Sequence, residues 1–479
     1  MGLAEKTVKN FGIVFSSLIL LRLIEIAGKI VLIRILTPED FGLVAIASLY
    51  LSFYVLVQTG GLDQAIIYRK ERALEAAETS FTLMLVIGIV LYMVVYATAP
   101  HVARFFGSEA AEAVIKVLGL SLLLASLAQV PIAIIVKELS FGRDAAVSII
   151  STVVNTASSI TLALLGYGYW SLVYGALAGS LTGTLVSWRL CPWKLKLAFD
   201  RKLAWEMLGY GKFILLASIA TYLTTNIDDI SVGKLLGVTA LGYYTISFNI
   251  SNLPATNITH LIGKVMFPTY SKLQDEPESL KLAYLKTLRY VSLLSIPTAF
   301  GIMACAHDFV YILFKARWAP IVPFVQILAV YGLVRSLGAT TGELFKSVGR
   351  PQLISFYTSI ILVMLALFVI PVAYEYGLPG VCALVLVTGL IPTVFSILHV
   401  ARILGIRTSG LFLALRTQLA AGVLSLIPAV YLRSLVPETS IGTLLLVACA
   451  YTGSYILLVL LLDPSVKGEF KELAGMMVH

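Results

Sequence analysis

The feature that most constrains this chain is the recurrence of apolar segments about 20 residues long, which is the length a helix needs to cross the ~30 Å hydrocarbon core of a bilayer. Of its 479 residues, 59% are hydrophobic and only 13% are charged, whereas soluble globular proteins carry roughly 25% charged residues. So few charges do not cover a water-exposed surface of this size. We therefore predict an all-α integral membrane protein.

We assign about fourteen transmembrane helices to these segments, because strands of a membrane barrel would alternate in polarity at every second residue. The segments cover residues 11–33, 41–64, 80–99, 113–135, 147–166, 170–188, 211–231, 240–263, 287–305, 321–343, 352–373, 379–399, 411–432 and 441–462.

The distribution of Lys and Arg predicts the orientation of these helices. With the N-terminus in the cytoplasm, the cytoplasmic segments hold 22 Lys and Arg residues and the outer segments hold six. Cytoplasmic loops are enriched in these residues, so we expect a multi-pass protein of the cell (plasma or inner) membrane with both termini cytoplasmic. This topology and contact with anionic membrane lipids account for the net charge of +9, with no need for a nucleic-acid partner.

An internal repeat divides the chain. IRILTPEDFGLVAIA (33–47) aligns without a gap on GKLLGVTALGYYTIS (233–247), so that Gly42 matches Gly242. Two further matches follow in the same order, SFGRD (140–144) with SVGRP (347–351) and residues 166–183 with 374–390. Because the repeating unit has an even number of spans, we predict two pseudo-symmetric six-helix lobes related by an axis along the membrane normal, followed by two C-terminal helices.

The predicted boundaries follow from this repeat. They are a first lobe at 1–188, a basic cytoplasmic linker at 189–210, a second lobe at 211–400, and at 401–479 the last two helices with a cytoplasmic tail. Paired lobes around a central cleft are typical of carriers that work by alternating access.

Three stretches carry a family resemblance: RILTPEDFGLVAIA (34–47), GLDQAIIYRK (61–70) and KLLGVTALGYYTISFNISNLP (234–254). Together with the paired halves, they resemble the polysaccharide-exporter branch of the MOP flippase superfamily, the Wzx-like oligosaccharide flippases. The resemblance implies a MATE-like fold that moves polyprenyl-diphosphate-linked oligosaccharide from the cytoplasmic to the outer leaflet. We also expect a monomer, with polysaccharide polymerase or assembly proteins as further partners.

Charged residues within the first span are the leading candidates for a binding site. Arg22, Glu25 and Lys29 are spaced by three and four residues and so share one helical face. Such a face avoids lipid, because a charge at the bilayer centre costs roughly 2.5–3.5 kcal/mol even on the lenient scale. We interpret Arg22 and Lys29 as donors to the substrate diphosphate, oriented by Glu25. The alternative is a Glu–Lys pair within the helix beside a snorkelling Arg.

Two more arginines are candidates for the same site. Arg335 lies deep in the tenth span, whereas Arg34 lies near the outer end of the first. The TPED sequence after Arg34 predicts a helix start, with Thr37 as the N-cap and Pro38 at the first helical position.

The second half carries opposite charge at the matching depth. Asp229 occupies the repeat position of Lys29, beside Asp228. These carboxylates, with Asn226 and Lys234, could form an outer gate or bind a coupling H⁺ or Na⁺; solvated carboxylates at a helix end are the alternative.

Three amides inside spans complete the candidate residues: Asn155, Asn249 and Asn252. Each could line the cleft, while helix–helix packing through small polar residues is the competing interpretation.

An enzyme of the same pathway is disfavoured, because the chain has no Gly-rich phosphate loop, metal-ligand spacing or nucleophile motif. We predict no catalytic residue, no metal site and no cofactor. The remaining alternative is a cation-coupled drug or metabolite antiporter of related architecture. It would need an acidic cleft, whereas the charged face of the first span is net basic.

Overall fold

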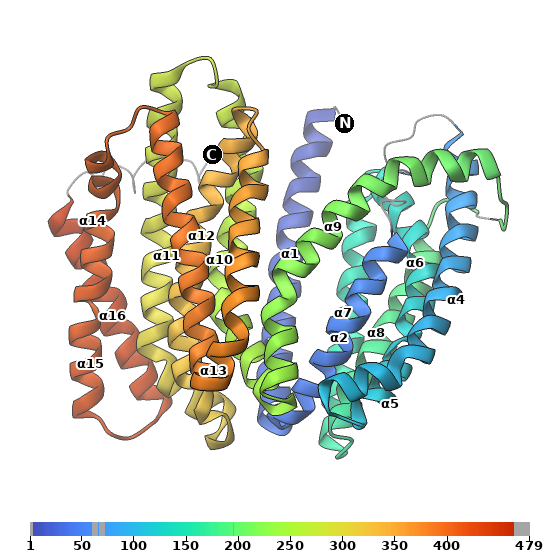
Figure 1. Cartoon of the computed structure of the whole chain (residues 1–479), viewed down its shortest axis with the longest axis horizontal. Coiled ribbons are helices and arrows are strands. Elements are labelled where there is room, and N and C mark those ends of the chain that lie inside the picture. The colour runs from blue at the N-terminus through green and yellow to red at the C-terminus, as the bar shows by residue number, and fades with distance from the viewer. Residues whose placement is uncertain (1–2, 60–65, 67–71, 195, 464–479) are drawn as a thin grey trace. The chain divides into compact units, whose positions relative to one another are not determined.

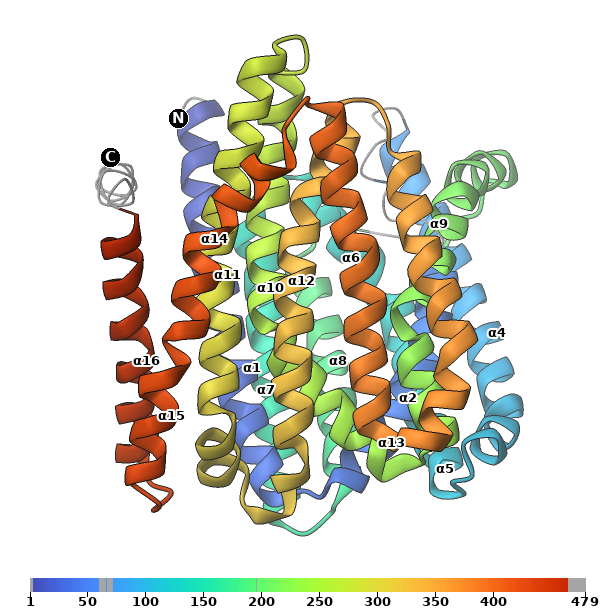
Figure 2. The ribbon, with the colours of Figure 1, turned by 60° about the vertical axis from the view of Figure 1, so that its left-hand side comes forward.

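The computed structural model describes residues 3–59, 66, 72–194 and 196–463, and this part of the chain is helical with connecting segments and no β-strand (Figure 1, Figure 2). By packing, the chain divides into two compact units, Met1–Gly242 and Tyr243–His479. The 61–70 motif lies outside the described residues, apart from the buried Ile66. The predicted all-α fold is confirmed.

In the first unit, α7 packs on both α1 and α8, and α4 packs on α6. The elements are α1 (Leu3–Ile35), α2 (Pro38–Thr59), α4 (Ala73–Phe106), α5 (Ala110–Leu118), α6 (Leu120–Lys137), α7 (Phe141–Leu164), α8 (Tyr169–Leu190), α9 (Arg201–Leu235) and the start of α10 (Val238–Lys272). The predicted lobes assign α9 to the second half of the chain. In the structure α9 packs on α2 and α4, within the first unit.

In the second unit, α11 is the central helix and packs on α12, α14 and α16. The elements after α10 are α11 (Pro277–Phe314), the 3₁₀ helix η1 (Ala316–Ile321), α12 (Val322–Ser347), α13 (Gln352–Ile403), α14 (Thr408–Leu424), α15 (Leu426–Leu435) and α16 (Ile441–Leu462). The chain of α13 turns sharply at Gly377, whose φ of 59° and ψ of −149° suit only glycine (Figure 2). This turn separates the predicted spans 352–373 and 379–399.

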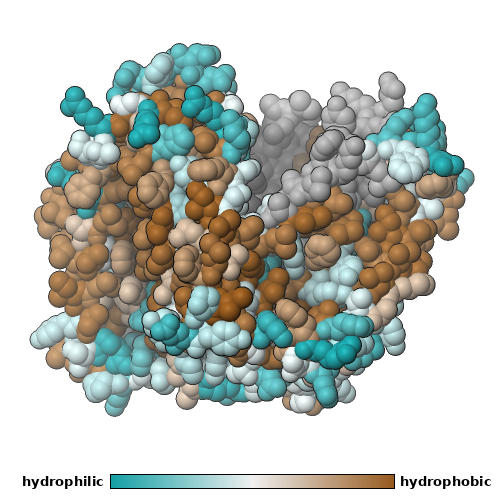
Figure 3. Space-filling view, in the orientation of Figure 1, coloured by the Kyte–Doolittle hydropathy of each residue, from teal (hydrophilic) through white to brown (hydrophobic). Residues whose placement is uncertain are grey.

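Within the described residues, nine helices are long and apolar enough to cross a membrane. As far as the structure describes them, the fourteen predicted apolar segments lie in helices, except for turn residues at Gly119, Leu165, Gly166 and Ser425. Figure 3 shows hydrophobic side chains over the middle of the second unit's helices and hydrophilic residues at their ends. Large apolar side chains such as Phe412, Ile427 and Leu461 are more than half exposed, as expected where lipid is the solvent.

The predicted start of α2 is confirmed by its hydrogen bonds. The Asp40 backbone N–H donates to Thr37 Oγ1 at 3.2 Å, and the Asp40 carboxylate accepts from the Thr37 backbone N–H at 2.7 Å. This reciprocal pairing satisfies donors that a helix N-terminus leaves without partners. Asp200 begins α9 similarly, accepting from the backbone N–H groups of Lys202 and Leu203. The Leu203 N–H, followed by the Arg72 guanidinium, holds the pKa of Asp200 below its usual range.

The internal repeat is visible in the helix ends. The helices α1 and α9 end at Ile35 and Leu235, and α2 and α10 begin at Pro38 and Val238, each pair 200 residues apart. The repeat-related glycines also pack symmetrically. A Cβ on Gly42 would lie 2.0 Å from the Val238 carbonyl oxygen, and one on Gly242 would lie 1.9 Å from that of Pro38. The first turns of α2 and α10 therefore approach each other at backbone distance.

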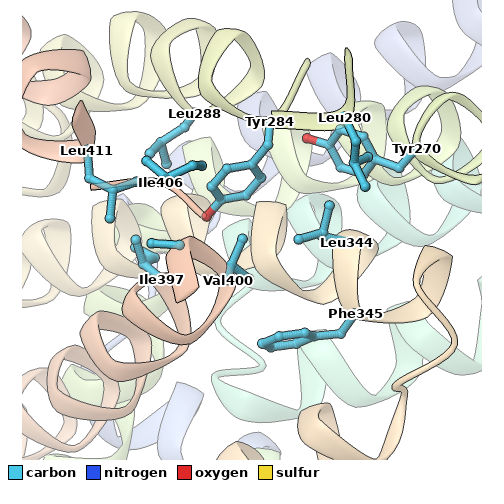
Figure 4. Packing of buried hydrophobic residues seen from close by; sticks show 11 residues of the cluster. Tyr270, Leu280, Tyr284, Leu288, Leu344, Phe345, Ile397, Val400, Ile406 and Leu411 are labelled. Atoms are coloured by element: carbon cyan, nitrogen blue, oxygen red, sulfur yellow. The ribbon is translucent and has the colours of Figure 1, made fainter. Parts of the chain in front are cut away.

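A buried cluster closes one end of the second unit (Figure 4). It joins Tyr270 of α10, Tyr284 of α11, Leu344 of α12, Val400 of α13 and Leu411 of α14. The ring of Tyr284 lies near the middle of the cluster in Figure 4 and is fully buried. Because lipid tails are as apolar as these side chains, the cluster stabilises the unit through close packing more than through the hydrophobic effect.

The glycine contact predicts a stability defect. Gly42→Ala and Gly242→Ala each force a methyl group against a backbone carbonyl, so we expect each to destabilise the protein by about 1–3 kcal/mol. Thermal unfolding in detergent, followed by size-exclusion chromatography with fluorescence detection, measures this. Gly453→Ala is the matched control, since its Cβ would meet nothing within 4 Å. Equal stability of all three variants would contradict the close approach.

Candidate functional site

The charged residues of α1 lie on an exposed face of the first unit. Arg22 Nη1 donates to Glu25 Oε2 at 2.9 Å, and the two side chains are 55% and 44% exposed. Lys29 is also exposed. The face of α1 that packs on α7 carries other residues: Gly28 lies against Thr156, and Leu32 is buried. The ionic stripe is therefore not used in packing against α7, and Glu25 neutralises one of its two cations.

Arg34 is exposed in the last turn of α1, just before the capped start of α2. It lies five residues beyond Lys29, which is about 7.5 Å along a helix axis. Its role in diphosphate binding stays a prediction.

The predicted gate residues lie near the end of α9. Asp228 is buried and Asp229 is half-buried, while Asn226 donates to the Tyr222 carbonyl oxygen at 2.8 Å. Lys234 Nζ donates to the Phe105 carbonyl oxygen at 2.7 Å. A cation is favourable there, because Phe105 belongs to the last turn of α4, where the carbonyl groups of a helix gather.

In the second unit, the structure brings together two of the predicted residues. Arg335 Nη1 donates to Asn252 Oδ1 at 3.0 Å, and the guanidinium lies 5.9 Å from the centre of the Tyr331 ring. The Asn252 side chain is buried, and its Nδ2 group donates to the Phe248 carbonyl oxygen at 3.1 Å, which turns its oxygen toward Arg335. Asn252 therefore positions an arginine that stays exposed, whereas Asn249, three residues earlier on α10, is itself exposed.

Asn155 lies where α7 meets α8. Its Oδ1 accepts a hydrogen bond from Ser159 Oγ at 3.3 Å. A Cβ on Gly179 would lie 2.7 Å from the Asn155 Cβ, so a glycine allows the two helices to approach closely here. Asn155 therefore lies in the α7–α8 packing contact, and it also lines a cavity between α6, α7 and α8.

Two ion pairs that sequence reasoning missed attach α11 to the C-terminal helices. Arg433 Nε lies 3.0 Å from Asp308 Oδ1, and Asp308 is fully buried. Arg289 Nη2 lies 2.7 Å from Asp463 Oδ2. Residues 289 and 308 are about 28 Å apart along a straight helix, which is close to the ~30 Å of hydrocarbon. The available signal was the complementary charge at the ends of predicted spans.

Comparison with known proteins places this arrangement in a class. The fold is that of MOP-superfamily transporters: the solved lipid II flippase MurJ, in an inward closed conformation, has a TM-score of 0.78 over 96% of this chain and 99% of that one, at 13% identity. An inward-facing MATE multidrug resistance transporter has a TM-score of 0.63 over 80% of this chain and 94% of that one, at 17% identity.

Residues 31–323 match the family model described as polysaccharide biosynthesis protein, and the chain belongs to this family. Among curated relatives, the lipopolysaccharide biosynthesis protein WzxC of Escherichia coli is 26% identical over 356 residues, covering 73% of this chain and 72% of WzxC. The resemblance inferred from the sequence motifs is confirmed.

The position of Arg335 yields one prediction. We expect Asn252→Leu to lower the free energy of unfolding by about 1 kcal/mol, because the guanidinium loses its acceptor. In a double-mutant cycle, Asn252→Leu added to Arg335→Leu should have a much smaller effect. Thermal unfolding of the four proteins in detergent measures this, and additive effects would argue against the contact.

The buried ion pair between Arg433 and Asp308 yields a further prediction about stability. Arg433→Ala leaves the carboxylate of Asp308 buried without this partner, so we expect a loss of about 3–5 kcal/mol. Arg289→Ala is the matched control. Its partner, Asp463, is 22% exposed, and the loss should be about 1 kcal/mol or less because water screens the charge. Thermal melts in detergent compare the two variants, and a reversed order would contradict the assignment.

Proposed function

We propose that this protein is a flippase that moves polyprenyl-diphosphate-linked oligosaccharide from the cytoplasmic to the outer leaflet for polysaccharide biosynthesis. The observation that carries the proposal is the exposed cationic stripe of Arg22 and Lys29 within an apolar helix. A charge in hydrocarbon costs several kcal/mol unless it meets water or a counter-charge. A diphosphate supplies such a counter-charge, and family membership indicates a substrate of polysaccharide synthesis.

Each site residue has a role in this proposal. In the first unit, Arg22 and Lys29 donate to the diphosphate, with Arg34 as a further donor and Glu25 orienting Arg22. In the second unit, Arg335 is a further candidate donor. Guanidinium groups suit phosphate oxygens, because two parallel N–H donors match two oxygens. The prenyl tail stays in lipid while the two units alternate in access.

Ion coupling is the second part of the proposal. Asn226, Asp228 and Asp229 bind H⁺ or Na⁺ or form an outer gate, with Lys234 held at the end of α4. Both termini are cytoplasmic, in agreement with the positive-inside rule. The protein is a transporter rather than an enzyme, and polysaccharide polymerase or assembly proteins are its proposed partners.

The antiporter alternative is disfavoured by charge. A cationic drug would be repelled by a stripe of two cations and one anion. Family membership, and relatives such as WzxC that are named for lipopolysaccharide biosynthesis, also support a saccharide substrate rather than a drug.

The proposal is tested by measuring transport in variants that lack one of the two cations of α1. We expect Arg22→Ala and Lys29→Ala each to lower transport by about 10- to 100-fold, because each loses a charge-assisted contact of about 1.5–3 kcal/mol. The measurement is the lipid-linked oligosaccharide that accumulates in cells whose own copy is deleted and replaced by each variant.

The matched control is Lys281→Ala, which removes a cation paired with Glu278 near the start of α11. It should transport normally. Unchanged export by Arg22→Ala and Lys29→Ala, at normal membrane levels, would remove the diphosphate site from α1.

A further inference from the structure

An open cavity lined by both polar and apolar residues lies in the first unit, between α6, α7 and α8. Its volume is about 400 Å³, which falls in the ~300–1,000 Å³ range of small-molecule sites. The polar side chains that line it are Ser121, Gln129, Ser148, Ser151, Thr152, Asn155, Ser180 and Thr184. We call it the α6–α8 cavity. Its described lining holds no Asp, Glu, Lys or Arg, so its polar groups are neutral hydroxyls and amides beside apolar side chains such as Leu124 and Ile132.

Several of these groups have unused hydrogen-bonding capacity. Gln129, Ser121 and Thr152 make no side-chain hydrogen bond to any residue in the described part of the chain, and the Asn155 Nδ2 group donates none. At this depth in a bilayer, polar groups without partners are costly. They are therefore satisfied by water or by a ligand rich in hydroxyl groups.

Helix–helix packing explains only some of the polar residues that line the α6–α8 cavity. Gly175, Gly179 and Gly183 of α8 approach Ser159, Asn155 and Ser151 of α7, as small residues do where membrane helices pack closely. Gln129 and Ser121 come from α6 and lie outside that glycine contact. Their side chains line open volume instead of a helix–helix contact.

The cavity lies at the same depth as the ionic stripe of α1. Gly28 of α1 lies against Thr156 of α7, and further along both helices Leu32 packs with Ala163. The two helices therefore run parallel. Measured from this contact toward the N-termini of the two helices, Arg22 lies about 9 Å from Gly28 along α1, and Ser151 lies about 7.5 Å from Thr156 along α7. Thr152, one turn before Thr156 on the same face, borders both the cavity and the α1 side of α7.

We propose that the α6–α8 cavity binds the sugar residues nearest the diphosphate, and that it favours uncharged sugars over uronic acids. This inference rests on the proposed function, because it places the glycan beside the head-group donors. Amide and hydroxyl side chains match the paired donors and acceptors of sugar hydroxyl and acetamido groups. A carboxylate-bearing sugar would enter a cavity with no cation to compensate its desolvation.

The test compares two probes on the purified protein in nanodiscs. One probe is lipid-linked oligosaccharide extracted from cells that lack this chain, and the other is polyprenyl diphosphate without sugar. The wild-type protein should bind the glycan-bearing lipid more tightly. Thr152→Val and Gln129→Leu should each reduce this advantage by about fivefold, the equivalent of a hydrogen bond of about 1 kcal/mol, and leave polyprenyl diphosphate binding unchanged.

The matched control is Thr161→Val, the same isosteric change on an exposed position of α7 outside the cavity. It should keep the full advantage. The inference is overturned if Thr152→Val and Gln129→Leu keep the glycan advantage, or if they weaken both probes equally and lower thermal stability. Failure of the wild-type protein to bind either probe would instead overturn the proposed function.

Discussion

The constraint on which the rest of this structure depends is that hydrocarbon satisfies no polar group. Each span is therefore helical, so that its backbone groups bond within the segment. Large apolar side chains such as Phe412 and Leu461 face outward, and polar residues lie at the helix ends. The same constraint gives every charged residue inside a span a high cost, which is why the partners of those residues are informative.

Charged residues near the ends of the spans have partners within the protein: the buried Asp308 carboxylate pairs with Arg433, and Lys234 donates to a carbonyl oxygen at the end of α4. Arg22 and Lys29, by contrast, are exposed on α1, and among the described residues Arg22 forms its ion pair with the neighbouring Glu25 of the same helix. This exposed stripe is the basis of the diphosphate site that we propose.

Much of the fold was predictable because periodicity and length are local properties. The apolar segments and the Thr37–Asp40 helix start both followed from short stretches of sequence. The Arg433–Asp308 pair and the α6–α8 cavity were not predictable, because each depends on residues far apart in the chain. Asp308 resembled a residue of an outer loop, and Gln129 was indistinguishable from an ordinary residue of an apolar helix.

By itself, the sequence determined the helical class, the positions of the spans, the repeat and the family, since each is written in composition, spacing or short motifs. The tertiary structure alone decided which helices share a unit, so that α9 packs on α2 and α4. It also decided that Gly42 packs on the start of α10, that Gly242 packs on the start of α2, and that Asn252 accepts a hydrogen bond from Arg335. The physical reason is that spans of similar apolarity have similar free energies in contact with lipid. The neighbours of each span are therefore selected by the shape and polarity of the faces that come into contact.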